Sequence, residues 1–135
     1  MAVKYNALEK LNDYREHGVD DHYTESYDGK KYLDVKFQVG GSATTEKNGA
    51  FIEDLLIVAY AKLNEYNQGL PSRENSLALT KIEEAILWLT ARKAVADNDF
   101  SAFKKMMAPQ VDAEALWTRL RKRIDTSVSK KRTKR

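Results

Sequence analysis

The sequence lacks cysteine altogether and holds only two histidines, His17 and His22. Without cysteine there is no disulfide, no thiolate metal site and no cysteine nucleophile, which is consistent with a reducing compartment. Two neighbouring histidines in a polar stretch do not complete a zinc site or a catalytic arrangement. We therefore expect no metal and no other cofactor.

Long apolar runs are missing too. The longest one, in residues 50–61, is interrupted by Glu53 and Asp54, and the N-terminus is not typical of a signal peptide. We expect a soluble, cytoplasmic protein without a membrane partner. Its 135 residues, 42% of them hydrophobic, suffice for one domain with a modest core.

The motifs of common enzyme sites are absent as well. The sequence has no P-loop, no glycine-rich dinucleotide loop, no nucleophile elbow and no metal-ligand spacing. Glu53 and Asp54 are adjacent on a predicted helix, so their carboxylates point about 100° apart and do not form an acid and base pair. Glu83 and Glu84 share that geometry. No catalytic residue is predicted, and a binding protein is the better class.

Positive charge is concentrated at the C-terminal end. The net charge is +3, but residues 119–135 carry nine lysines and arginines against one aspartate, whereas the preceding 118 residues carry fourteen against nineteen acidic residues. The basic tail, residues 128–135, ends in SKKRTKR without an apolar side chain, which predicts disorder. A charge run of this kind usually keeps a protein soluble. The alternative is that the tail binds nucleic acid through phosphate contacts.

The periodicity of apolar residues predicts an α+β fold in a single domain, residues 1–127. A short amphipathic helix is expected in residues 3–18, with Gly18 as its stop. Next, Asp28-Gly29 separates two segments that alternate apolar and polar residues, which is typical of a β-hairpin. Its arms are residues 23–27 and residues 32–39, and the apolar side of the second arm needs a helix or a partner chain to cover it.

Helical spacing dominates the rest of the chain. Two long central helices are predicted, residues 51–69 and a helix capped by Ser72 whose inward stripe includes Leu79 and Ile86. A short segment, residues 100–107, precedes a C-terminal helix expected from Asp112 to about Ser127. The N-terminal helix and the β-hairpin would pack on the two central helices.

Polar residues gather where the two central helices begin. Glu46-Lys47-Asn48-Gly49 precedes one helix and Arg73-Glu74-Asn75 opens the next, so backbone N–H groups and a guanidinium are available to an anion such as phosphate. Arg92 lies seventeen residues after Asn75, about 25 Å along a helix, so one chain cannot easily place both on one small ligand, whereas two chains packed antiparallel could. The alternative is structural: Arg73 pairs with a glutamate, Asn75 caps the helix and Arg92 offsets the helix dipole.

Two segments, "EKNGAFIEDLL" and "PSRENSLALTKIEEAILWLTAR", resemble the phage anti-defence sponge family, whose members counter bacterial Thoeris and CBASS immunity by sequestering nucleotide second messengers. The resemblance covers about residues 30–95 and leaves out the N-terminal helix and residues 96–135. It implies a non-catalytic homo-oligomer, a dimer or a hexamer of dimers, in the cytoplasm of the infected bacterium. The implied ligand is glyco-cyclic ADP-ribose or a cyclic oligonucleotide.

The resemblance also implies ligand-binding residues. Asn75 and Arg92 would contact ribose and phosphate, with Arg73 as a neighbouring phosphate contact. Tyr66 resembles the aromatic position on which a base stacks. Asn48 matches the first motif, although it and Gly49 could equally provide the tight entry to a helix. Two other classes stay open: a small nucleic-acid-binding phage protein that uses the basic tail, and a purely structural oligomer.

Overall fold

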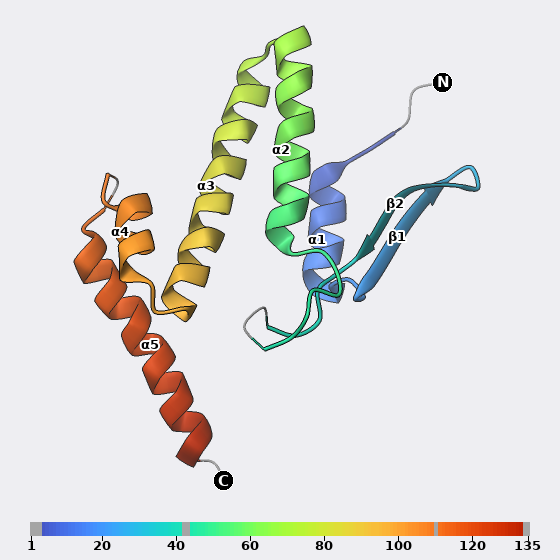
Figure 1. Ribbon diagram of the computed structural model, residues 1–135. Helices are drawn as coiled ribbons and strands as arrows, with labels where there is room; N and C mark the ends of the chain where they lie inside the picture. The colour runs from blue at the N-terminus through green and yellow to red at the C-terminus, as the bar shows by residue number, and fades with distance from the viewer. Residues whose placement is uncertain (1–3, 42–43, 110, 134–135) are drawn as a thin grey trace. The chain divides into compact units, whose positions relative to one another are not determined.

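The computed structural model describes residues 4–41, 44–109 and 111–133, with side chains through residue 124. Contacts within the chain define two compact units, residues 1–55 and residues 56–135. Figure 1 shows the order of elements, a helix and a β-hairpin followed by four further helices in the described part of the chain. The predicted α+β class is confirmed, with its N-terminal helix, hairpin, two long central helices and C-terminal helix.

The first unit begins with helix α1, Ala7–His17. The side chain of Asn6 accepts a hydrogen bond from the backbone N–H of Glu9 at 3.1 Å and so caps the first turn. Gly18 ends the helix with a φ of 66° and donates its N–H to the carbonyl of Tyr14. That φ favours glycine because it has no Cβ, so the predicted stop at Gly18 is confirmed.

The hairpin follows as strands β1, His22–Tyr27, and β2, Lys30–Lys36, paired antiparallel. Asp28 and Gly29 both have positive φ, 53° and 71°, which fits the two-residue turn that matches the twist of the strands. The predicted turn is therefore confirmed. The second strand starts two residues earlier than expected and ends at Lys36.

A charged and aromatic cluster joins α1 to one face of the hairpin. Its centre is Glu25, whose side chain is 11% exposed and forms an ion pair with Lys10 at 2.5 Å. The hydroxyls of Tyr23 and Tyr32 also donate to Glu25. The ring of Tyr23 meets the ring of Tyr14 edge to face, with centroids 5.7 Å apart. These contacts cover part of the hairpin face for which the sequence required a cover.

Beyond β2 the chain returns to the hairpin before the first central helix. Phe37 and Ala50 form an isolated parallel bridge, in which the N–H of Gln38 donates to Ala50 at 2.8 Å. Gly49 permits this approach, because a Cβ there would lie 2.5 Å from the backbone of Phe37. The loop thus aligns the entry to the next helix.

The two central helices are α2, Ile52–Gly69, and α3, Arg73–Ala96. Figure 1 shows them side by side and running in opposite directions, and the turn that joins them is residues 70–72. The hydroxyl of Tyr60 on α2 donates a hydrogen bond to Glu83 on α3. The central pair is therefore a helical hairpin, as its two apolar stripes predicted.

The buried core of the second unit lies at the C-terminal part of α3. Helix α4, Phe100–Met107, and helix α5, Ala113–Thr133, pack against it. Phe103 and Met107 are 0% and 1% exposed, and each buried side chain of this size contributes about 1.5–3 kcal/mol. Trp117 meets the ring of Phe103 at 5.3 Å between centroids. Of the stripe predicted for α3, Leu79 is buried and Ile86 is half-buried.

Helix α5 continues further than the sequence predicted. Its backbone is helical to Thr133, whereas the expected helix ended near Ser127. Lysine and arginine have good helix propensity, and extending an existing helix costs far less than nucleating one. Among the described residues, no helix is long and apolar enough to cross a membrane.

Candidate functional site

The turn between α2 and α3 is fixed by one side chain. Asn67, on the last turn of α2, accepts a hydrogen bond from the backbone N–H of Ser72 at 3.0 Å. Its amide nitrogen donates to the hydroxyl of Ser76 at 3.3 Å. The backbone N–H of Leu70 donates to the carbonyl of Tyr66 at 2.9 Å and closes the end of α2. We call this region, residues 66–76, the hairpin tip.

The first turn of α3 offers donors at the hairpin tip. Ser72 caps the helix by accepting from the N–H of Asn75 at 3.0 Å, which confirms the predicted cap. Arg73 is exposed and Asn75 is half-buried. A helix N-terminus carries partial positive charge, and a guanidinium beside it strengthens the attraction for an anion. The tip therefore combines a cation with helix N–H groups.

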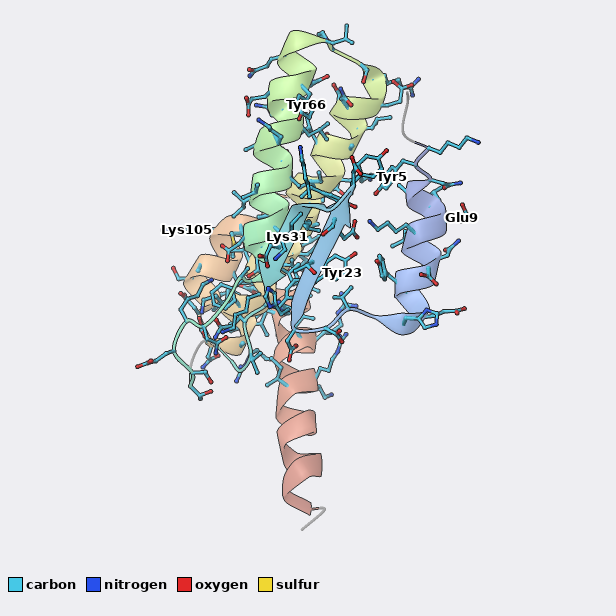
Figure 2. All side chains as sticks on the ribbon, turned by 90° about the vertical axis from the view of Figure 1, so that its right-hand side faces the viewer. Tyr5, Glu9, Tyr23, Lys31, Tyr66 and Lys105 are labelled. Atoms are coloured by element: carbon cyan, nitrogen blue, oxygen red, sulfur yellow. The ribbon has the colours of Figure 1, made fainter. Side chains whose placement is uncertain are left out.

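Tyr66 brings an aromatic surface to the same turn. Its side chain is 60% exposed, and Figure 2 shows it on the upper part of α2, near the turn. The ammonium of Lys62 lies 5.8 Å from the centre of its ring. An exposed ring of this kind can stack on a nucleobase, a contact worth about 1–3 kcal/mol.

Asn48 belongs to the first unit, and its side chain forms hydrogen bonds within the loop that follows β2. It accepts from the N–H of Val39 and donates to the carbonyl of Val39, both at 2.8 Å. The side-chain oxygen of Gln38 accepts from the N–H groups of Asn48 and Gly49. These bonds hold the loop that leads into α2. They support the alternative that Asn48 and Gly49 shape the entry to the helix.

Arg92 does not lie at the hairpin tip, because it is near the other end of the 24-residue helix α3. The distance along the helix axis from Asn75 is about 25 Å at about 1.5 Å per residue. Of the five predicted ligand residues, the structure brings Tyr66, Arg73 and Asn75 to one turn. Within one chain it leaves Arg92 apart from them, at the other end of α3, while Asn48 belongs to the first unit.

Arg92 instead lines a groove between α3 and α5 with a volume of about 230 Å³. The guanidinium of Arg121 on α5 donates to the carbonyl of Val95 on α3 at 2.8 Å and ties the two helices together there. We call this space the α3–α5 groove. Its lining residues are Trp88, Ala91, Arg92, Val95, Leu120, Arg123 and Ile124.

The sequence did not identify two of these features. Asn67 carried no signal beyond its place at a helix end, because the turn that it bonds forms only when α2 and α3 meet. The α5 side of the groove had a signal, since Leu120 and Ile124 lie four residues apart on one helix face. What the periodicity did not reveal is that this face meets the C-terminal part of α3.

The pKa of Tyr60 is raised because Glu83 accepts its hydrogen bond, and partial burial adds to this effect. That bond links the two central helices. In the part of the chain that the structure describes, no group of three or more His, Cys, Asp or Glu side chains is arranged to hold a metal ion.

Comparison with known proteins finds matches to the segment that contains β2, α2 and most of α3. Residues 30–94 match the family model of the Acb2/Tad1 hairpin domain. Thoeris anti-defense 1 of Bacillus phage SBSphiJ7 is 38% identical to this chain over 65 residues. The match covers 47% of this chain and 46% of that relative, so it spans about half the length of each. No solved structure matches the chain.

These matches confirm the resemblance that the two sequence motifs indicated. The matched segment runs from β2 to the last turn of α3 and contains the whole hairpin tip. It also contains all five predicted ligand residues. Helices α1, α4 and α5 lie outside it.

Proposed function

We propose, from the Acb2/Tad1 hairpin domain in residues 30–94, that this protein is a phage anti-defence protein that binds and sequesters nucleotide immune messengers. The messengers are glyco-cyclic ADP-ribose or cyclic oligonucleotides, and their capture blocks Thoeris or CBASS signalling in the host cytoplasm. The observation that carries the proposal is the match of this segment to the hairpin family. The polar and aromatic hairpin tip inside the segment supports it.

The groups at the hairpin tip suit a nucleotide. Arg73 and the N-terminus of α3 attract phosphate, and the amide of Asn75 can hydrogen-bond to ribose. The exposed ring of Tyr66 gives a base a surface to stack on. Each of these contacts recognises a nucleotide without reacting with it.

The position of Arg92 favours a site that two chains share. Two copies of α3 packed antiparallel would bring Arg92 of one copy to the tip of the other, which one chain cannot do over about 25 Å. The proposed assembly is therefore a homodimer, or a hexamer built from such dimers. Exposed apolar side chains on α2 and α3 would give the copies contact area, among them Ile57, Val58 and Leu77.

Sequestration requires affinity but no chemistry. Nanomolar binding corresponds to about 12 kcal/mol, which several charge-assisted contacts and stacked bases can supply in an enclosed site. Captured messenger is then withheld in proportion to the amount of protein. We propose accordingly that the protein is not an enzyme.

A nucleic-acid-binding protein is the second candidate, and the charge of α5 favours it. Arg119, Lys122 and Arg123 are basic residues on this helix, and the sequence beyond it adds the basic tail. Binding through these groups would depend mainly on phosphate contacts and would weaken steeply with salt. The matched hairpin segment contributes nothing to that alternative, so we place it second.

A thermal-shift screen of the purified full-length protein tests the proposal. The panel contains glyco-cyclic ADP-ribose isomers, linear ADP-ribose, and cyclic di- and trinucleotides, and the bound ligand is recovered by heating. A cyclic nucleotide at 1,000 times its Kd stabilises the fold by about 4 kcal/mol and is recovered intact if the protein is a sponge. If no member of the panel raises the Tm, or if the ligand is recovered as a product, the proposal is overturned.

A further inference from the structure

The α3–α5 groove is built by residues on both sides of the matched segment's end. Trp88 and Arg92 come from α3 inside the segment, while Arg123 and Ile124 come from α5 outside it. The hydrogen bond from Arg121 to the carbonyl of Val95 holds the two walls together. The groove is therefore a feature that the hairpin segment alone does not possess.

The lining of the groove combines an apolar floor with positive charge. Ala91 and Val95 are buried at 1% and 3% exposure, and Leu120 and Ile124 are half-buried beside them. Trp88 is 48% exposed and offers a large aromatic surface. The two charged lining residues, one on each helix, are arginines.

We propose that this groove binds a nucleobase together with its adjacent phosphate. The base would stack on Trp88 over the apolar floor, and the phosphate would lie between the guanidiniums of Arg92 and Arg123. Sites for whole drug-sized ligands occupy about 300–1,000 Å³. At about 230 Å³ the groove fits one base of a larger molecule.

The nucleotide unit has two sources, a cyclic messenger or a single-stranded nucleic acid. For the messenger, the inference rests on the proposed function and adds the C-terminal helix to the site around Arg92. A second copy of this chain fits less well. Pairing of identical grooves about a twofold axis would place arginines against arginines and remove their charges from water.

The fluorescence of Trp88 gives a direct test, because the sequence contains only two tryptophans, Trp88 and Trp117. Trp117→Phe keeps an aromatic ring against Phe103 and leaves Trp88 as the only indole. The full-length variant is titrated with AMP, a cyclic adenine trinucleotide, glyco-cyclic ADP-ribose and a short oligodeoxyadenylate. We expect at least one of them to quench Trp88 saturably.

Arg123→Glu supplies the charge test and Arg119→Glu its matched control. Both change the charge of α5 equally, but Arg119 does not line the groove. We expect Arg123→Glu to weaken the binding of the quenching ligand about tenfold or more, which corresponds to about 1.4 kcal/mol. Arg119→Glu should change this affinity less than about twofold. Equal weakening by the two variants would overturn the proposal, since it would indicate only general attraction to a basic surface.

A second variant covers the case in which Trp117→Phe does not fold. Trp88→Phe leaves Trp117 in the core, and ligand-dependent quenching should disappear from this protein. Quenching that persists in Trp88→Phe, or quenching of Trp88 by raised protein concentration without ligand, would overturn the proposal. The latter would show a second copy in the groove.

The two ligand classes separate this inference from the proposed function. Quenching by a cyclic messenger supports both. Quenching by the oligonucleotide alone, in a protein whose Tm no cyclic messenger raises, supports the groove and contradicts the sponge. A messenger could raise the Tm without quenching Trp88 and bind equally well to the Arg123→Glu variant. That result would support the sponge proposal and overturn the groove proposal. If no ligand quenches Trp88, the groove proposal fails.

Discussion

The side-chain oxygen of Asn67 accepts a hydrogen bond from the backbone N–H of Ser72 at 3.0 Å. Ser72 in turn caps α3, so this bond links the last turn of one central helix to the first turn of the next. Asn67 also donates to Ser76 inside α3. One amide therefore sets the geometry of the hairpin tip on which the proposed nucleotide contacts are placed.

Asn67→Ala removes both bonds and leaves the N–H of Ser72, a half-buried residue, without its partner. We expect the free energy of unfolding to fall by about 1–3 kcal/mol, because an unsatisfied donor carries its desolvation cost. Urea denaturation followed by far-UV circular dichroism measures the change. Gln68→Ala, at an exposed neighbouring position on α2, is the control and should unfold within about 0.5 kcal/mol of the parent. Equal midpoints for the two variants would contradict a structural role for Asn67.

Gly49→Ala tests the close approach between the loop and β2. The added Cβ would lie 2.5 Å from the backbone carbon and oxygen of Phe37, and backbone cannot rotate away as a side chain can. We expect a loss of about 1–3 kcal/mol and faster hydrogen exchange at the N–H groups of Gln38 and Ala50, which form the bridge. Gly69→Ala is the control, since a Cβ there meets nothing within 4 Å. Unchanged exchange at the bridge in Gly49→Ala would show that the loop adjusts at no cost.

The contact between α1 and the hairpin should depend on pH through Glu25. The hydrogen bond from Lys10, and then that from Tyr32, lowers the pKa of Glu25 below its ordinary value of 4.5. A lowered carboxyl pKa stabilises the fold above pH 4.5, and the contribution is lost as pH falls through the pKa of the folded protein. The pKa of Lys10 is raised above 10.5 chiefly by the same bond, so its contribution persists below pH 10.5 and is lost as pH rises through the raised value.

NMR of the tyrosine rings in the cluster follows this transition. We expect Tyr23 and Tyr32 signals to shift together in acid, and Glu25→Gln to abolish that step because glutamine does not titrate. Glu9→Gln, on an exposed part of α1, is the matched control and should retain the step. An acid step that survives in Glu25→Gln would assign the transition to another group.

Local signals in the sequence located most of the elements. Gly18, the Asp28-Gly29 turn and the cap at Ser72 each work through their own backbone conformation or hydrogen bond, so neighbouring residues suffice to reveal them. The C-terminal boundary of α5 was harder to predict from the sequence. Its last residues have no apolar side chain, but helix propagation from a packed segment does not require one.

The candidate site could be predicted only in part, because local sequence signals reveal only residues that are near each other along the chain. Tyr66, Arg73 and Asn75 are near each other along the chain, and a short turn keeps them close. Asn48 lies in the first of the two sequence motifs that resemble the family. Its side chain, however, forms hydrogen bonds to Val39, and residue spacing in the sequence does not reveal that contact. Arg123 reaches the environment of Arg92 only through the packing of α5 on α3.

Arg92→Ala and deletion of residues 128–135 distinguish the sponge from a nucleic-acid-binding protein. The sponge predicts that Arg92→Ala weakens messenger binding about tenfold or more, through loss of a charge-assisted contact, and that the deletion changes it little. A nucleic-acid-binding protein predicts that the deletion weakens DNA binding and reduces its salt dependence. Isothermal titration with messenger and with oligonucleotide measures both. Lys93→Ala is the control, because Lys93 pairs at 3.0 Å with Asp97, the residue that follows α3. Equal effects of Arg92→Ala and Lys93→Ala would contradict a ligand contact for Arg92.

A mixing experiment tests whether two chains share the site. In an antiparallel dimer each site takes Asn75 from one chain and Arg92 from the other, so Asn75→Ala and Arg92→Ala each damage both sites. A heterodimer of the two variants has one site with both side chains intact and one with neither.

We expect each variant alone to bind messenger weakly. After denaturation and refolding together, about half of the dimers should be heterodimers, each with one site of parental affinity. Titration of the refolded mixture, compared with each variant refolded alone, measures this recovery. No recovery in a mixture that contains heterodimers would place Asn75 and Arg92 of the same chain on one ligand, or one of them outside the site.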